Sequence, residues 1–188
     1  MIGNDIVDLK YSASNWNRPR FLQKVFTQKE QRYISCSENK HETLWLLWSM
    51  KEAAYKIHVQ QCGERFFNPK RLVCELRSNN EGVVIVDKNT YFTKSILTED
   101  YVYTIARLQA FKIKESTLFK VEMSLYSVQS ELLKKALLTS ISKTKQLPLQ
   151  HLEIKKTKVG VPELFYNDFK LHLSLSLTHC GRYSGFAY

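Results

Sequence analysis

The chain has 188 residues, of which 44% are hydrophobic and 24% are charged, a balance typical of a folded globular protein and not of a disordered one. Its longest apolar stretches fall short of the ~20 residues that a membrane-spanning helix needs. Asp5 and Asp8 stand in the first ten residues, which does not fit a signal peptide. We therefore expect a cytoplasmic protein with no membrane partner.

The formal net charge is +10. This charge fits an anionic partner such as nucleic acid, an acidic protein or a polyphosphate ligand, but it does not choose among them. The four cysteines include no C-x-x-C pair, so we expect free thiols and no zinc site.

The first part of the chain is predicted to begin with a strand at residues 2–9, followed by an amphipathic helix at 18–26. Thr27 and Glu30 have the spacing of a capping box, which predicts the start of a second short helix. Apolar residues recur with helical spacing from about 41 to 59, which predicts a third helix. Alternating or apolar runs then predict a small antiparallel set of strands at 71–76, 83–86 and 101–106.

The second part repeats this theme. Residues 118–125 alternate as a strand, and 127–142 form an amphipathic helix pattern that Ser127 would cap. Further strands are predicted at 152–157, 164–166, 171–177 and 182–188. No Gly/Ser-rich linker separates the parts, so we expect two closely packed halves, 1–110 and 111–188, in the α+β class.

Three side chains have the chemistry of a phosphate-handling site. Asp5 lies in the first predicted strand, and Glu52 and Lys56 are four apart on one helical face. Two carboxylates and an ammonium fit a magnesium-dependent reaction at a phosphate, because oxygen ligands hold the metal and lysine neutralises phosphate charge. The alternative is structural: Asp5 as a residue of a strand end, and Glu52 and Lys56 as an exposed ion pair.

The segments Gly3-Asn4-Asp5-Ile6 and Trp48-Ser49-Met50-Lys51-Glu52-Ala53-Ala54-Tyr55-Lys56 resemble the two-part motif of the 4′-phosphopantetheinyl transferases. That family passes the phosphopantetheine arm of coenzyme A to a serine of a carrier protein. The resemblance implies that Asp5 and Glu52 bind Mg²⁺, with Mn²⁺ possible, and that Asp5, Glu52 and Lys56 are catalytic. Either Glu52 or a water would be the base.

Other segments extend the resemblance. Residues 20–30 are similar to a helix of the holo-acyl-carrier-protein synthases, and 176–183 and 160–162 are similar to the family's S-H-S-G and G-K-P segments. For coenzyme A, the resemblance implies contacts from Lys56, Thr178, His179, Gly160, Pro162 and Lys158. For an apo acyl or peptidyl carrier protein, it implies a docking surface at Arg18, Arg20 and Lys24.

The order of these motifs resembles a circular permutation of the longer, surfactin-type class, and it is also the order of the short, trimeric class. We expect a 4′-phosphopantetheinyl transferase-like fold of two similar helix-plus-antiparallel-sheet halves packed as a pseudo-dimer. A monomer with the site in the cleft between the halves is favoured, with a trimer as the alternative.

Two positions depart from the family pattern. Val7 stands where the longer class has a third acidic metal ligand, and Val161 stands where the family has a basic residue. A non-catalytic member that binds coenzyme A or a carrier is therefore one alternative function. A basic nucleic-acid-binding module is another, but we expect no nucleic-acid partner, because charge alone supports it.

Overall fold

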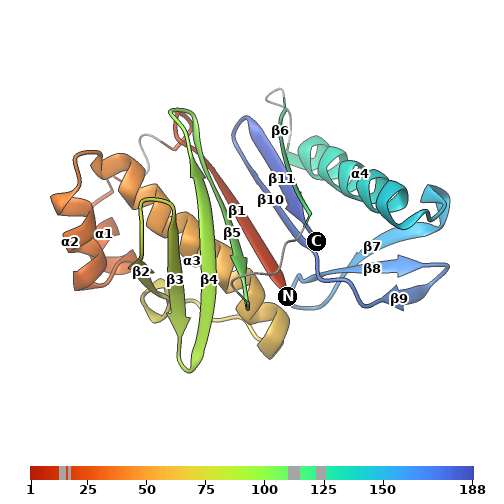
Figure 1. The fold of residues 1–188 in the computed structure, drawn as a ribbon, viewed down its shortest axis with the longest axis horizontal. Helices are drawn as coiled ribbons and strands as arrows, with labels where there is room; N and C mark the ends of the chain where they lie inside the picture. The colour runs from red at the N-terminus through yellow and green to blue at the C-terminus, as the bar shows by residue number, and fades with distance from the viewer. Residues whose placement is uncertain (13–15, 17, 110–114, 122–125) are drawn as a thin grey trace.

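The structure is a computed structural model, and it describes residues 1–12, 16, 18–109, 115–121 and 126–188. Helices and antiparallel sheets alternate along the chain (Figure 1), which confirms the α+β class. The boundary predicted between residues 110 and 111, and residues 122–125 of a predicted strand, lie outside the described residues.

The first half is a five-stranded antiparallel sheet with helices on one face and at one end (Figure 1). Its strand order is β1-β5-β4-β3-β2. The elements are β1 (Ile2–Asp8), α1 (Phe21–Val25), α2 (Gln28–Cys36), α3 (Lys40–Cys62), the 3₁₀-helix η2 (Pro69–Arg71), β2 (Val73–Leu76), β3 (Glu81–Val86), β4 (Asn89–Leu97) and β5 (Tyr101–Arg107).

The long helix α3 is the element that positions the site. Asn39 caps its start by accepting a hydrogen bond from the Glu42 N–H, and it ends at Gly63, whose φ of 70° is left-handed. It packs directly on β1. A Cβ built at Gly3 would lie 2.0 Å from the Ala53 carbonyl oxygen, so this close approach of strand and helix requires glycine.

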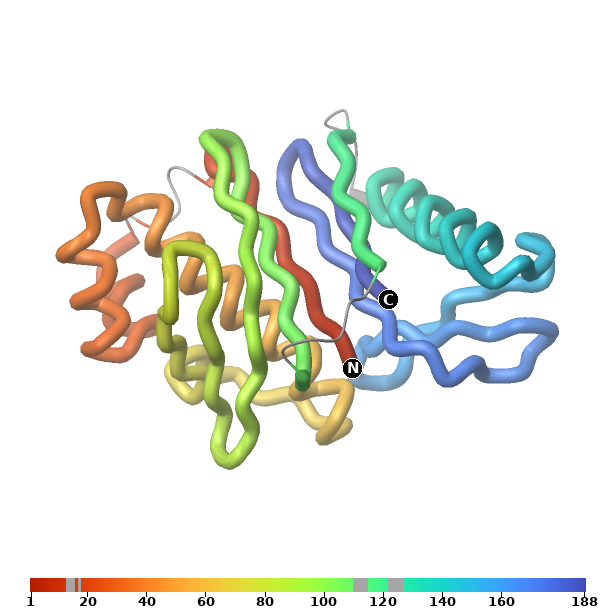
Figure 2. The backbone as a smooth tube through the Cα atoms, in the orientation of Figure 1, coloured from red at the N-terminus to blue at the C-terminus, as the bar shows by residue number. Residues whose placement is uncertain are grey.

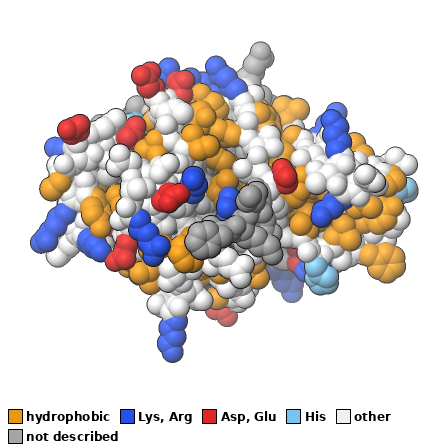
Figure 3. Space-filling model, in the orientation of Figure 1, with side chains coloured by type: hydrophobic (Ala, Val, Ile, Leu, Met, Phe, Trp, Pro, Cys, Tyr) orange, Lys and Arg blue, Asp and Glu red, His pale blue; other side chains and the backbone are white. Residues whose placement is uncertain are grey.

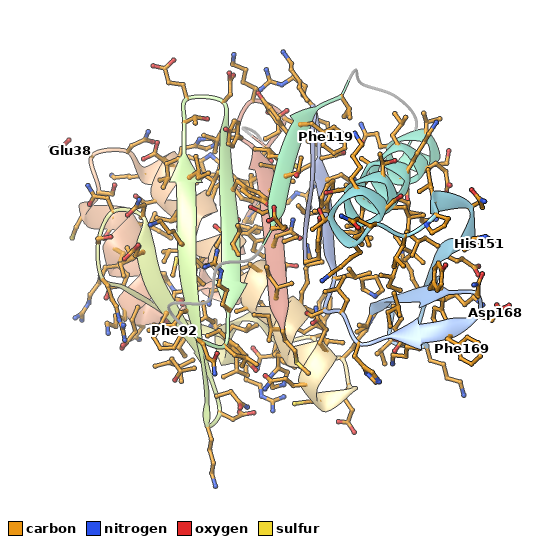
Figure 4. All side chains as sticks on the ribbon, turned by 45° about the vertical axis from the view of Figure 1, so that its right-hand side comes forward. Glu38, Phe92, Phe119, His151, Asp168 and Phe169 are labelled. Atoms are coloured by element: carbon orange, nitrogen blue, oxygen red, sulfur yellow. The ribbon has the colours of Figure 1, made fainter. Side chains whose placement is uncertain are left out.

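The described residues of the second half form one long helix and two three-stranded sheets, ordered β10-β11-β6 and β7-β8-β9. Its elements are β6 (Ser116–Lys120), α4 (Tyr126–Lys145), η3 (Leu149–His151), β7 (Leu152–Lys156), β8 (Pro162–Tyr166), β9 (Phe169–Leu171), β10 (Ser176–Cys180) and β11 (Tyr183–Ala187). Leu133, Leu137 and Ile141 of α4 are buried in its core. The β8–β9 turn, with Asp168 and Phe169, forms the tip farthest from the first half (Figure 4).

The halves meet where β10 lies beside β1, with both chain ends close by (Figure 2). Side-chain hydroxyls of the segment that leads through β10 accept hydrogen bonds from alternate backbone N–H groups of β1. The pairs are Ile2 N to Ser174 Oγ at 2.8 Å, Asn4 N to Ser176 Oγ at 2.9 Å, and Ile6 N to Thr178 Oγ1 at 3.1 Å. We call this set the hydroxyl ladder. It satisfies the edge of β1 without a direct backbone pairing.

A buried ion pair joins the halves at the other end of β1. Asp8 is fully buried, and Arg182 donates to it through Nε at 2.8 Å, Nη2 at 2.8 Å and its backbone N–H at 2.9 Å. These hydrogen bonds outweigh burial and lower the pKa of Asp8 to about 2. Asp8 therefore holds the β10–β11 hairpin in place.

Several predicted elements are confirmed, including the strand at β1, the capping box of Thr27 and Glu30, and the helix at α3. Others differ. Strands β4 and β9 were not predicted, and the strand predicted at 171–177 begins only at Ser176. Because α4 begins at Tyr126, Ser127 lies inside the first turn and does not precede the helix. The strands of the second half are split between two sheets, whereas the first half has a single sheet.

Candidate functional site

Asp5 lies in the middle of β1 with only 8% of its surface exposed. Its Oδ1 lies 3.4 Å from Lys56 Nζ and accepts a hydrogen bond of 3.2 Å from Thr178 Oγ1. Burial raises the pKa of this carboxyl, and the charge and hydrogen bond of Lys56 work in the opposite direction. Asp5 is therefore a desolvated carboxylate at the junction of the halves, and not a residue of a solvated turn.

Glu52 lies one helical turn before Lys56 on α3. Burial, and after it the negative charge of Asp5, raise its pKa to about 7 against the opposing charge of Lys56. The effect of Asp5 means that the two carboxylates are close enough for their charges to interact. Two carboxylates and one ammonium thus share one poorly solvated corner.

Lys56 connects the two halves. Its Nζ donates to the Asn4 carbonyl at 2.6 Å and to the Leu177 carbonyl at 3.2 Å, besides its contact with Asp5. An ammonium group has three N–H donors, and three acceptors from two strands surround this one. This is not the exposed i,i+4 ion pair that helical spacing alone would suggest.

The oxygen atoms of Asp5 and Glu52 fit a divalent cation, because hard cations take carboxylate oxygens and a positive charge would relieve the repulsion between them. Within the described part of the chain, no group of three or more His, Cys, Asp or Glu side chains is placed to hold a metal. Two carboxylates, Asp5 and Glu52, are thus available to a cation in this corner, and its other ligands would be further oxygen atoms of protein, water or substrate.

A cavity of about 930 Å³ opens beside this corner, between α3 and the second half. Its wall includes five of the residues predicted to bind metal, coenzyme A or a carrier protein, and these are Lys24, Glu52, Lys56, Gly160 and Pro162. The Arg65 side chain donates from Nε to the Val159 carbonyl at 2.7 Å. This bond joins the segment after α3 to the β7–β8 turn in the cavity wall, and Gly160 of that turn has a left-handed φ of 79°.

The cavity combines an aromatic wall with cationic groups. Phe21, Trp48, Tyr55, Phe66 and Phe67 line one part, and the cations Lys24, Lys56, Arg65 and Lys156 also line it. Such a lining suits a ligand with both an anionic part and an apolar or ring-containing part.

The other predicted residues lie around this centre. Thr178 is buried against Asp5, and the pKa of partly buried His179 is lowered by burial and by the charges of Lys56 and Lys156. Lys158 is exposed and is not in the cavity wall, where Lys156 is found instead.

The predicted docking residues Arg18, Arg20 and Lys24 are exposed at α1, and Lys24 also reaches the cavity. On the face in Figure 3, Lys and Arg side chains are scattered among acidic and uncharged groups instead of forming one basic stripe.

Sequence reasoning assigned no role to several residues of this region. Gln60 and Arg65 line the cavity, and Lys51 lies fully buried with Nζ 2.9 Å from Glu30 Oε1. The signal for Gln60 was its position four residues after Lys56, which places it on the same face of α3. No comparable signal marked Arg65, because its contact with Val159 joins segments 94 residues apart.

The two halves thus enclose one cavity lined by carboxylate, cationic and aromatic side chains. A family model described as the 4′-phosphopantetheinyl transferase superfamily matches residues 1–106. The chain therefore belongs to this superfamily of transferases, as its motifs indicated.

The crystal structure of Thermotoga maritima holo-[acyl-carrier-protein] synthase is similar over 90% of this chain and 83% of that one, with a TM-score of 0.44 and 12% sequence identity. No match was found among curated protein sequences. None of the helices in the described ranges is long and apolar enough to cross a membrane.

Proposed function

We propose that this protein transfers the 4′-phosphopantetheine group of coenzyme A to a serine hydroxyl of an apo carrier protein and releases 3′,5′-ADP. The observation that carries the proposal is the meeting of Asp5 and Glu52 at one desolvated corner of the large cavity. Superfamily membership supports the same reaction.

Asp5 and Glu52 are the proposed protein ligands of Mg²⁺ or Mn²⁺. When bound there, the cation would neutralise charge on the pyrophosphate of coenzyme A. The two carboxylates would otherwise repel that pyrophosphate, so the proposed activity depends on a divalent cation.

The reacting bonds are those of phosphoryl transfer. The serine Oγ attacks the β-phosphorus, the bond from that phosphorus to the 3′,5′-ADP oxygen breaks, and the serine proton leaves. Glu52 is the proposed base, directly or through an intervening water, because a serine hydroxyl is a weak nucleophile and needs a group that accepts its proton. Lys56 would stabilise negative charge on the leaving group, exchanging one of its two carbonyl partners for a phosphate oxygen.

The cavity supports coenzyme A as the co-substrate. Its cations, Lys56 among them, suit the phosphates, and the proposed contacts of Gly160 and Pro162 lie in its wall. Thr178 and His179 lie beside the Asp5 corner, and Lys156 is better placed than Lys158 to reach a ligand. Arg18, Arg20 and Lys24 remain the proposed carrier dock, since carrier proteins of this kind are acidic.

The test is the intact mass of a panel of apo carrier proteins incubated with this protein, coenzyme A and Mg²⁺. We expect one carrier to gain a single phosphopantetheine and the gain to disappear on chelation. Asp5→Ala and Glu52→Ala should each abolish the gain while circular dichroism shows an intact fold. Substantial transfer by both variants would refute the site assignment.

The same assay separates the proposal from a non-catalytic role. Coenzyme A raises the melting temperature of any protein whose folded state binds it. Stabilisation by coenzyme A without mass gain on any carrier would indicate a binding protein without turnover. Absence of both effects would overturn the proposed function.

A further inference from the structure

The cavity follows one face of α3 and has two ends of different chemistry. Its α3 wall extends from Trp48 to Gln60, which is about 18 Å of helix. At one end Phe21 of α1 packs on Trp48, with the ring centroids 6.3 Å apart. Arg65 lines the other end, just after Gly63, where the helix stops. The carboxylate corner lies between an aromatic end and an end that carries a cation.

Arg65 reaches from the first half to the β7–β8 turn of the second. Its Nε donates to the Val159 carbonyl at 2.7 Å. Its Nη2 lies against Gly160, so closely that a Cβ built on this glycine would overlap it. An arginine side chain has five N–H donors. Within the described ranges, the bond to Val159 is the only hydrogen bond of this side chain, which leaves the four N–H groups on Nη1 and Nη2 for a ligand.

The turn itself brings no cation into the cavity wall. Val161 stands where the superfamily pattern has a basic residue, and it is a partly buried apolar residue of that wall. Lys158 of the same turn is exposed and lies outside the wall. The Arg65 guanidinium therefore supplies a positive charge at a turn that has none of its own facing the cavity.

A guanidinium held at Nε and open at both Nη groups suits a phosphate, because its parallel N–H groups match two phosphate oxygens. Coenzyme A carries a pyrophosphate and, on the far side of the ribose, a 3′-phosphate. In the proposed reaction the pyrophosphate lies in the carboxylate corner, beside Lys56. The 3′-phosphate is then the anionic group of the ligand that remains for a cation beyond Gln60.

We propose that Arg65 binds the 3′-phosphate of coenzyme A and so replaces the basic side chain that position 161 lacks. This inference rests on the proposed function, since it takes coenzyme A as the ligand of the cavity. The cation comes from the first half, whereas position 161 belongs to the second. The bond to Val159 orients the guanidinium before the ligand arrives, which lowers the entropy cost of binding.

Calorimetry with coenzyme A and with dephospho-coenzyme A, which lacks only the 3′-phosphate, tests this assignment. Each ligand is titrated into the protein with Mg²⁺ and without a carrier, so the measurement does not depend on transfer. The wild type should bind coenzyme A at least ~10-fold more tightly than the dephospho form, because hydrogen bonds between charged groups contribute about that factor or more. Arg65→Met should raise the Kd of coenzyme A about 10-fold and that of the dephospho form less than about 3-fold.

Two further variants control for charge and position. Arg77→Met removes the same charge at an exposed site outside the cavity wall, and it should keep the wild-type preference for coenzyme A. Val161→Lys, added to Arg65→Met, returns a cation to the turn in the wall. The double variant should recover at least part of the preference that Arg65→Met loses.

The outcomes separate this inference from the proposed function. Equal weakening of both ligands by Arg65→Met would overturn the assignment, because a residue that only shapes the wall cannot distinguish them. A preference that survives in Arg65→Met would also overturn it, and loss of the preference in Lys156→Met would then assign the 3′-phosphate to Lys156 of the same wall. Equal affinity of the wild type for both ligands would overturn it while a mass gain on a carrier still upheld transfer. Absence of binding by either ligand would overturn the proposed function itself.

Discussion

Replacing Glu52 with Gln should make the cation-free protein more stable at neutral and alkaline pH. Burial and the charge of Asp5 raise the pKa of Glu52 from 4.5 to about 7. The folded state therefore binds this proton more tightly than the unfolded chain does. The free energy of unfolding consequently falls as pH rises from about 4.5 to about 7, because the unfolded chain ionises first.

The size of the effect follows from the shift. Each pKa unit corresponds to about 1.4 kcal/mol, so ionised Glu52 costs the folded state about 3 kcal/mol above pH 7. Gln keeps the shape and removes the charge. The variant should therefore gain up to about 3 kcal/mol at pH 8 and nothing below about pH 4.5.

Urea unfolding at several pH values in a chelator measures this difference, and Glu38→Gln is the exposed control, expected to change stability by less than about 0.5 kcal/mol. Adding Mg²⁺ at 100 times its Kd should stabilise the wild type by about 2.7 kcal/mol but not Glu52→Gln. A variant no more stable than wild type at pH 8 in chelator would refute the reasoning that burial and Asp5 strain this carboxylate.

The remaining predictions concern the frame around the site. Asp8→Asn should lower the free energy of unfolding at pH 7 by about 2 kcal/mol. The pKa of Asp8 is lowered from 3.8 to about 2, so the ionised carboxylate stabilises the fold above pH 4, and this stabilisation is lost on acidification. Acid titration followed by circular dichroism should therefore show a smaller loss of stability with falling pH for the variant. Gly3→Ala should prevent folding or lower the melting temperature far more than the control Gly63→Ala. A Cβ at Gly63 meets no atom within 4 Å, and its left-handed φ should lower the free energy of unfolding by only about 1 kcal/mol. Similar losses of stability in the two variants would contradict the close packing of β1 on α3. Lys51→Met should cost about 3–5 kcal/mol in urea unfolding, because it leaves the buried Glu30 carboxylate unpaired. Adding Glu30→Gln should recover part of that loss, and strictly additive losses would argue against the pair.

The sequence placed Asp5, Glu52 and Lys56 in the elements where the structure has them, whereas it located several of the surrounding strands less well. Asp5 is recognisable in a short apolar strand, and the spacing of Glu52 and Lys56 places them on one helical face. Spacing could not indicate that Lys56 bridges two backbone carbonyls, because its partner Leu177 lies 121 residues away. The burial that raises the pKa of Glu52 likewise depends on packing between distant segments.

The missed and displaced strands have a physical cause. In β4 the inward positions include Thr93 and Ser95, which are buried, so the alternation of polar and apolar residues is weak. Residues 171–177 do alternate, yet strand pairing begins only at Ser176. From Ser176 onward the backbone of β10 pairs with β11, whereas Ser174 lies before this pairing and contacts β1 through its hydroxyl.

The hydroxyl ladder also bears on self-association. A sheet's outer strand with open backbone donors is a template for another molecule's strand. Here β1 ends its sheet, and Ser174, Ser176 and Thr178 occupy its donors. Three small side chains thus accept the hydrogen bonds that the backbone of a neighbouring strand would otherwise accept. A second copy of the chain therefore finds no open N–H donors here on which to add a strand.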